Sequence, residues 1–210
     1  IILRPDLTFE TAGVAEGCRV ICGVDEAGRG PWAGPVVAGA VILKYTGLSD
    51  ELRIGLNDSK KIKPTVRETL FKTLRIQARI GIGAASVEEI DSINILQATM
   101  LAMGRAIDDL GEPSPDLALV DGNRAPKVNC SVRTIVKGDT LSLSIAAASV
   151  VAKVARDQLM GDLDLKYPGY GWARNAGYGT AEHKSALAKL GVTPAHRKSF
   201  APIRKMLSPD

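Results

Sequence analysis

Residues 19–35 read RVICGVDEAGRGPWAGP, an apolar run that ends in two adjacent acids and a glycine-rich turn. The β-branched and apolar residues 19–24 are typical of a buried strand. The carboxylates of Asp25 and Glu26 need a metal ion or a polar network beside them, because an uncompensated buried charge is costly. The glycines allow positive φ and a close approach of a ligand to the backbone. The stretch predicts a metal or phosphate site, with a plain solvated turn as the alternative.

The glycines Gly28, Gly30 and Gly34 do not form a dinucleotide-binding fingerprint. The pattern G-x-G-x-x-G would require glycine at position 33, where the chain has Ala33. No acid suited to binding a ribose follows in a second strand. The spacing therefore argues against a nicotinamide or flavin dinucleotide site.

Composition indicates one globular domain. The chain has 210 residues, of which 45% are hydrophobic and 24% charged, and a net charge of +4 that is compatible with a polyanionic partner. The longest stretch of low polarity is too short to span a bilayer, so we expect no membrane association. Three cysteines without a paired framework favour a reducing compartment, and we expect a cytoplasmic protein. Because no apolar stripe is left unassigned, we expect a monomer.

Strands and helices alternate after an opening hairpin, which predicts an α/β fold with a mixed five-stranded sheet flanked by helices. The expected strands are residues 19–25, 33–43, 79–85, 116–121 and 132–136. A helix is expected over residues 64–76. Another is expected to begin after Ser86, with Glu89 completing a capping box. Two more are expected, one from a cap at Thr140 to about residue 165 and one over residues 181–190. The helix that Ser86 opens is expected to be short, and a longer helix follows it. The longer helix has an apolar stripe that we assign to the core: Ile93, Leu96, Met100, Met103, Ile107 and Leu110.

Two further acids, Asp121 and Asp139, follow predicted strands beside glycine-bearing turns. If the three strands are neighbours, Asp25, Glu26, Asp121 and Asp139 converge at the sheet edge where α/β proteins bind ligands. Because like charges repel, such a cluster requires divalent cations, and all-oxygen ligands favour Mg²⁺ or Mn²⁺. The arrangement suits two-metal phosphodiester hydrolysis. One geometric difficulty is that adjacent strand residues face opposite sides of a sheet.

Ten segments follow one another from about residue 20 to 203: VDEAGRGPWAGP (24–35), NDSKK (57–61), EID (89–91), NILQAT (94–99), LVDGN (119–123), VKGD (136–139), SIAAASVVAKV (144–154), YP (167–168), GYGT (177–180) and HRKSF (196–200). Together and in this order they resemble type-2 ribonuclease H, also called ribonuclease HII. The resemblance implies an RNase H-like fold over residues 1–165, with a helical extension at 166–210 packed on it as one functional unit.

The resemblance also implies endonucleolytic cleavage of RNA in RNA–DNA hybrids, and of DNA duplexes that contain single ribonucleotides, leaving 3′-hydroxyl and 5′-phosphate ends. The catalytic and metal-binding acids would be Asp25, Glu26, Asp121 and Asp139, with Mn²⁺ or Mg²⁺. Gly28, Arg29 and Gly30 match the turn that reads the ribose 2′-hydroxyl, the group that distinguishes RNA from DNA. Tyr178 matches the tyrosine that stacks on the neighbouring deoxyribose.

Three further residues are expected to contact the substrate: Lys60, Asn123 and His196. For Lys60 simple solvation is an equal alternative, and for His196 a structural role is. One departure from the family pattern is Asn175-Ala176, where many members have His-Lys before the GYGT motif. A DNA nuclease or recombinase of the same fold, and a catalytically silent hybrid-binding module, are the alternative functions; the intact set of acids argues against the second.

Overall fold

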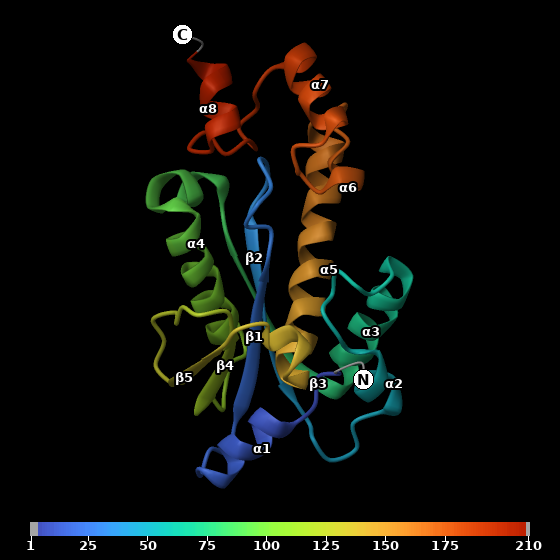
Figure 1. The fold of residues 1–210 in the computed structure, drawn as a ribbon, viewed down its shortest axis with the longest axis vertical. Helices are drawn as coiled ribbons and strands as arrows, with labels where there is room; N and C mark the ends of the chain where they lie inside the picture. The colour runs from blue at the N-terminus through green and yellow to red at the C-terminus, as the bar shows by residue number, and fades with distance from the viewer. Residues whose placement is uncertain (1–3, 209–210) are drawn as a thin grey trace.

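A central five-stranded sheet organises the computed structural model, which describes residues 4–208 (Figure 1). The strands are β1 (Ile21–Ala27), β2 (Val36–Leu43), β3 (Ala78–Ala85), β4 (Leu117–Asp121) and β5 (Ser131–Ile135), in the order β3-β2-β1-β4-β5. β1 pairs antiparallel with β2, and β2 with β3, whereas β4 runs parallel to β1 and to β5. The predicted hairpin and mixed sheet are therefore confirmed.

Helices cover both faces of this sheet (Figure 1). α4 (Val87–Asp109) lies on one face, and α5 (Leu143–Lys166) lies on the other. α2 (Asp50–Gly55) and α3 (Pro64–Gln77) lie on the α5 side. Ser86 caps α4 through the expected capping box with Glu89. None of the helices within residues 4–208 is long and apolar enough to cross a bilayer.

α4 packs so close to the sheet that glycine and alanine, rather than large side chains, form the contact. A Cβ atom added at Gly81 would lie 2.1 Å from the carbonyl oxygen of Ala106, and one at Gly83 would lie 2.2 Å from that of Ala102. The predicted stripe is therefore only partly core. Met103, Ile107 and Leu110 are buried, whereas Ile93 is 38% exposed. Ile93 precedes Asn94, whose non-helical backbone (φ 67°, ψ 163°) kinks α4 and separates a short first helix from a longer second one, as predicted.

α5 approaches β1 and β2 in the same way, over Gly23 and Gly39, as its run of small residues predicts. Its N-cap differs from the prediction. Thr140 belongs to a 3₁₀ turn, η1 (Gly138–Thr140), and Ser142 caps the helix by accepting a hydrogen bond from the Ile145 amide at 3.2 Å. The chain makes this additional turn before α5 begins, which places Asp139 at the sheet edge.

A short helix, α1 (Thr8–Ala15), was not expected from the sequence. It is attached to the start of α5 by the buried carboxylate of Glu10, which accepts hydrogen bonds from the Ser142 hydroxyl at 2.6 Å and the Ser144 amide at 2.9 Å. Backbone hydrogen bonds join Asp6 to Leu141 and Leu143. The N-terminal segment thus supports the turn that carries Asp139.

The C-terminal helices gather at one end of α5, at the top of Figure 1. They are α6 (Trp172–Asn175), α7 (Ala181–Leu190) and α8 (Ala201–Leu207), of which α6 and α8 were not predicted. Trp172 is fully buried in a cluster that includes Ala33 from the β1–β2 connection and Met160 from α5. A helical C-terminal extension is therefore present, and its division from the catalytic domain at residue 165 stays a prediction.

Candidate active site

The register of the sheet brings the predicted acids together. β1 and β4 are parallel, and their pairing ends with Val24 beside Val120. The next residues on these strands are Asp25 and Asp121, so both carboxylates emerge at the same level of the sheet. One carboxylate oxygen each from Asp25, Glu26 and Asp121 lies within 4.8 Å of the others. The structure thus forms the acidic cluster that the strand ends predict.

The point at which β1 stops pairing with β4 explains how the adjacent residues Asp25 and Glu26 both reach one site. Asp25 is on the same face of β1 as Gly23 and therefore faces α5, whereas Glu26 starts from the other face. β1 pairs with β2 as far as Ala27, but with β4 only as far as Val24. Beyond that point one side of β1 has no neighbouring strand, which leaves room for the longer Glu26 side chain to turn around the edge.

Burial and mutual repulsion oppose ionisation of this cluster. Burial raises the pKa of Asp25 well above its usual value, and the charges of Glu26 and Asp121 raise it further. Burial likewise raises the pKa of Glu26, although the nearby Arg29 guanidinium, at 3.4 Å, opposes this effect. Asp25 retains only 6% of its exposure. Repelling, buried carboxylates that offer only oxygen ligands fit a hard divalent cation such as Mg²⁺ or Mn²⁺.

Asp139 adjoins this cluster from the η1 turn. The Gly138 amide donates a hydrogen bond to Oδ1 of Asp121 at 2.6 Å, so the turn is attached directly to one of the cluster's acids. Burial raises the pKa of Asp139, and the charge of Asp121 contributes to that rise. Within the part of the chain that the structure describes, Asp139 lies outside the 4.8 Å group. Three of the four predicted acids are grouped, and the fourth lies next to them.

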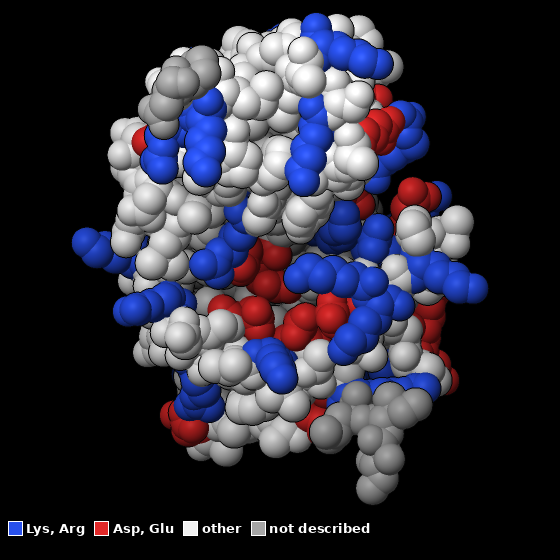
Figure 2. Space-filling view, turned by 45° about the horizontal axis from the view of Figure 1, so that its top comes forward, with Lys and Arg blue, Asp and Glu red and all other residues white. Residues whose placement is uncertain are grey.

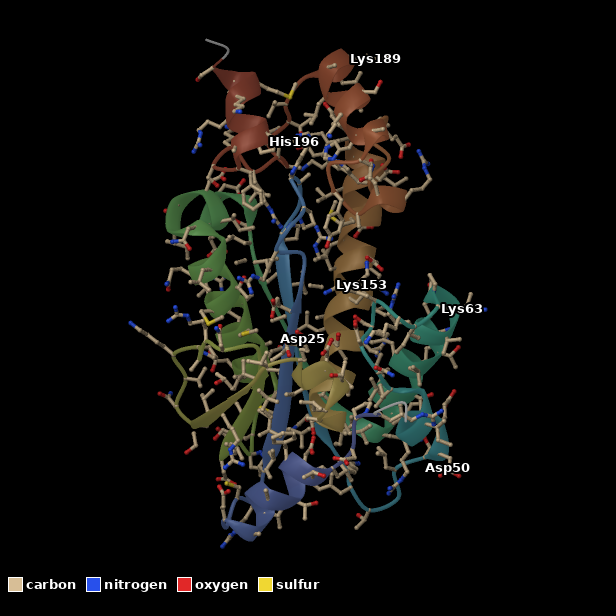
Figure 3. The ribbon with its side chains drawn as sticks, viewed as in Figure 1. Asp25, Asp50, Lys63, Lys153, Lys189 and His196 are labelled. Carbon is tan, nitrogen blue, oxygen red and sulfur yellow. The ribbon has the colours of Figure 1, made fainter. Side chains whose placement is uncertain are left out.

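Five of the seven predicted substrate residues line a cavity beside the acids. Glu26, Lys60 and Tyr178 line a space of about 420 Å³ together with the turn Gly28-Arg29-Gly30. A Cβ atom added at Gly30 would lie 3.4 Å from the Tyr178 ring, so the turn and the ring are direct neighbours. Figure 2 shows acidic side chains in a hollow with Lys and Arg side chains around it. In Figure 3, Asp25 on β1 lies below Lys153 of α5. Basic side chains around an acidic centre suit a polyanion that is bound together with metal ions.

Two buried arginines that sequence reasoning missed hold the turn in place. Arg197 donates to the carbonyl oxygens of Gly28 at 2.6 Å, Arg29 at 2.9 Å and Gly34 at 2.9 Å. Arg156 donates to other carbonyls around the same connection, those of Ala33, Pro35 and Ala176. The HRKSF motif contains Arg197, but only the tertiary structure shows that its side chain points back into the protein. With the carbonyls occupied in this way, the amide groups of the turn are left for a ligand.

Burial lowers the pKa of Arg197 to about 9 and that of Arg156 to about 10. Both guanidinium groups therefore remain charged at neutral pH. Within residues 4–208, the hydrogen-bond acceptors of the two guanidinium groups are backbone carbonyls and the Met160 sulfur. Two buried positive charges thus lie directly behind the predicted substrate-binding turn.

The structure corrects the prediction for His196. Its ring is fully buried, so it does not contact a substrate directly. Nδ1 accepts a hydrogen bond from the Thr193 amide at 3.0 Å, and Nε2 lies 3.1 Å from Nε2 of His183. The alternative structural role applies, because both ring nitrogens bond inside the protein. By contrast Lys60 and Asn123 are exposed, Lys60 beside the acids and Asn123 in the turn after β4.

The buried histidine pair predicts a pH dependence of stability. Burial lowers the pKa of both rings, that of His196 from 6.5 to about 4, and His183 contributes to that shift. Between pH 6.5 and 4 the unfolded chain therefore binds more protons at these positions, so their contribution to stability is lost as the pH falls. We expect the melting temperature to fall less between pH 7.5 and 5.0 in the variant His196→Gln than in the unaltered protein.

The melting temperature of the variant must be compared with that of the unaltered protein at both pH values. The acids whose pKa is raised stabilise the fold as the pH falls, which opposes the effect of the histidines. Glu182 also faces His183 and opposes the lowering of its pKa. Melting measured without metal, at both pH values, checks the expectation. An equal fall in the two proteins would show that His196 does not titrate in the expected range.

The mixed sheet and the acid cluster at its edge fit the ribonuclease H class. Comparisons with known proteins agree: a sequence profile described as Ribonuclease HII matches residues 22–203. The chain is 57% identical over 205 residues to Ribonuclease HII of Paramagnetospirillum magneticum, a match that covers 97% of this chain and 98% of that protein. Ribonuclease HII of Rhodospirillum rubrum is 56% identical over 206 residues, covering 97% and 92%.

A crystal structure of ribonuclease H2 from Pyrococcus horikoshii superposes with a TM-score of 0.73 at 27% identity, covering 90% of this chain and 97% of that one. The chain belongs to the ribonuclease HII family. It is therefore a ribonuclease H, a hydrolase.

Proposed function

We propose that this protein cuts the RNA strand of RNA–DNA hybrids and cuts DNA duplexes on the 5′ side of single embedded ribonucleotides, leaving 3′-hydroxyl and 5′-phosphate ends. The observation that carries the proposal is one cavity shared by Glu26, the turn Gly28-Arg29-Gly30 and Tyr178. A group that recognises ribose thus lies beside a group that holds metal. Such an activity would serve ribonucleotide excision repair.

The acids have a defined part in this reaction. Asp25, Glu26, Asp121 and Asp139 would hold Mg²⁺ or Mn²⁺ at the edge of the sheet. Two such ions, when bound, supply an activated water and stabilise the leaving oxygen in phosphodiester hydrolysis. The hydrogen bond from the Gly138 amide fixes Asp121, and the Glu26 amide donates to Oδ1 of Asp25 at 2.7 Å, so two of the ligands are oriented before any ion binds.

The turn supplies the selection for RNA. Arg197 binds the carbonyls of Gly28 and Arg29, which leaves the turn's amides to meet a 2′-hydroxyl. A backbone contact of this kind reads the sugar without reading the base, so cleavage would be independent of sequence. Tyr178 is 45% exposed and adjoins Gly30, where its ring can stack on the next sugar. Lys60 lies beside the cavity and can contact a phosphate.

Cleavage at a single junction tests the proposal. A duplex with one ribonucleotide in a DNA strand should be cut on its 5′ side with Mg²⁺ or Mn²⁺ present, and not after chelation. The same duplex with deoxyribose at that position should be cut about 10⁴-fold more slowly, the discrimination typical of a site built to bond a hydroxyl. End-labelled products resolved on a denaturing gel give the position and the end chemistry.

Two results would contradict it. Equal cutting of the all-DNA duplex would indicate a general DNA nuclease. Salt-sensitive binding of the hybrid without any metal-dependent product would indicate a silent binding module.

A further inference from the structure

Two histidines form a chain of hydrogen bonds that ends at the backbone of Tyr178. The Nδ1 atom of His183 lies 3.0 Å from the Tyr178 carbonyl oxygen, and its Nε2 lies 3.1 Å from Nε2 of His196. Both imidazole rings are fully buried. Figure 3 shows His196 among the C-terminal elements, well above Asp25, so this pair stands apart from the acid cluster.

The partners of the two rings determine which nitrogens carry protons. The Thr193 amide donates to Nδ1 of His196, so the proton of that ring is on Nε2 and points at His183. The Trp172 indole also donates to Nε2 of His183, at 3.1 Å. Two donors therefore meet at His183 Nε2, which must accept. The remaining proton of His183 is on Nδ1, where it is donated to the Tyr178 carbonyl.

Protonation would break this arrangement. Protonation of His183 would add a second N–H, at Nε2, which would point at the donors from Trp172 and His196. Burial also lowers the pKa of both rings. Glu182, on the same helix as His183, is engaged by Arg174. The pair is therefore neutral at physiological pH, with one fixed tautomer for each ring.

The same pair connects the tyrosine to the glycine turn. The backbone at His196 pairs with Ala33, and the neighbouring Arg197 amide donates to the Trp32 carbonyl at 2.8 Å. The Trp32 amide in turn donates to the Gly177 carbonyl, also at 2.8 Å. The segment that carries Tyr178 and the connection that carries the turn are thus both attached to the histidine pair.

We propose that His183 and His196 are positioning residues for junction recognition: their fixed tautomers hold the Tyr178 carbonyl and so set the Tyr178 ring against the Gly28–Gly30 turn. This inference rests on the proposed function, in which Tyr178 contacts the substrate. His183 and His196 are the two histidines of the sequence. The chain of hydrogen bonds that runs from the Thr193 amide through His196 and His183 to the Tyr178 carbonyl contains no charged group.

A double-mutant cycle tests the proposal on the single-ribonucleotide duplex. His183→Leu should raise KM about tenfold, the effect of one lost hydrogen bond, with little change in kcat. In a Tyr178→Ala background the same substitution should change KM less than about twofold, because the group it positions is gone. His183→Asn retains a donor near the Tyr178 carbonyl and should recover most of the loss.

The matched control is Tyr170→Phe, which removes a hydrogen bond to the Gly191 carbonyl within the same buried cluster and should leave KM unchanged. An equal KM effect of His183→Leu in both backgrounds would overturn the positioning role and leave only a structural one. If Tyr178→Ala itself leaves KM unchanged, the proposed role of Tyr178 fails instead.

A spectroscopic measurement tests the tautomers without substrate. Because the chain has two histidines, the side-chain region of the ¹⁵N spectrum of protein labelled with ¹⁵N-histidine contains signals from these two rings only. At pH 7 we expect His183 protonated on Nδ1 and His196 on Nε2. An imidazolium, or the opposite tautomer at His183, would overturn the proposal even if every variant folds poorly.

Discussion

Replacing Asp25 by asparagine should abolish cleavage and at the same time stabilise the metal-free protein. The carboxylate lies at the centre of the acid cluster, and we expect the rate to fall at least about 1000-fold, or about 4 kcal/mol of transition-state stabilisation. Cleavage of the single-ribonucleotide duplex measures the first effect. Thermal unfolding in the presence of a chelator measures the second.

The stabilisation follows from the pKa of Asp25. Burial and two neighbouring carboxylates raise that pKa, so the folded protein holds a proton there more readily than the unfolded chain. The ionised form therefore reduces stability at neutral pH, and this cost disappears as the pH falls below the unfolded pKa. Asparagine has nearly the same shape and no charge. The gain should be largest near neutral pH and small in acid, and each kcal/mol should raise the melting temperature by about 2–4 °C.

Asp50→Asn is the matched control. Asp50 is an exposed acid in the first turn of α2, far from Asp25 in Figure 3. Its loss should leave cleavage unchanged and bring no stabilisation. Added Mn²⁺ should raise the melting temperature of the unaltered protein and of this control, but far less that of Asp25→Asn. Retained cleavage in Asp25→Asn, or an equal response to Mn²⁺, would refute the assigned metal site.

The acid cluster could be predicted because its signal is local. Each of Asp25, Asp121 and Asp139 follows a predicted strand and lies in or beside a glycine-bearing turn, a pattern that the sequence shows directly. Their convergence then depended only on the order of the strands. The route by which Glu26 reaches the site could not be predicted, because it depends on where the β1–β4 pairing stops, and element boundaries are the least certain part of a sequence-based prediction.

The supporting residues were missed for a different reason. Arg156 and Arg197 lie on segments more than 100 residues from the turn they support, and arginines are usually solvated. Nothing local distinguishes Arg197 from Lys198 beside it. Burial against the carbonyls of a glycine turn is a property of the tertiary structure. The residues that we propose to face the substrate are therefore visible in the sequence, whereas the two arginines that hold their turn become visible only in the fold.

Gly28→Ala is the second change for which we expect a large effect, because a side chain there meets two obstacles. Gly28 has φ +98°, a conformation that L residues rarely adopt, and an added Cβ atom would lie 1.9 Å from Nε of Arg156. Arg156 cannot move aside without losing its bonds to the carbonyls of Ala33, Pro35 and Ala176. Strain of about 1–2 kcal/mol and overpacking of about 1–3 kcal/mol should add in the unfolding free energy.

Activity should fall as well, since the turn that we propose to read the ribose must shift. A displacement of about 1 Å can reduce a rate about 100-fold, and we expect a loss of that order on the single-ribonucleotide duplex.

The control Gly17→Ala separates the effect of backbone strain from that of the steric clash with Arg156. Gly17 also has φ +98°, but an added Cβ atom there has nothing within 4 Å, and the residue lies outside the site. The variant Gly17→Ala should lose only the part of the unfolding free energy that comes from backbone strain, and it should retain full cleavage. Denaturant unfolding and cleavage assays measure the two effects. If Gly28→Ala were no less stable than Gly17→Ala and cleaved normally, Arg156 would not be the rigid support of the turn that the structure indicates.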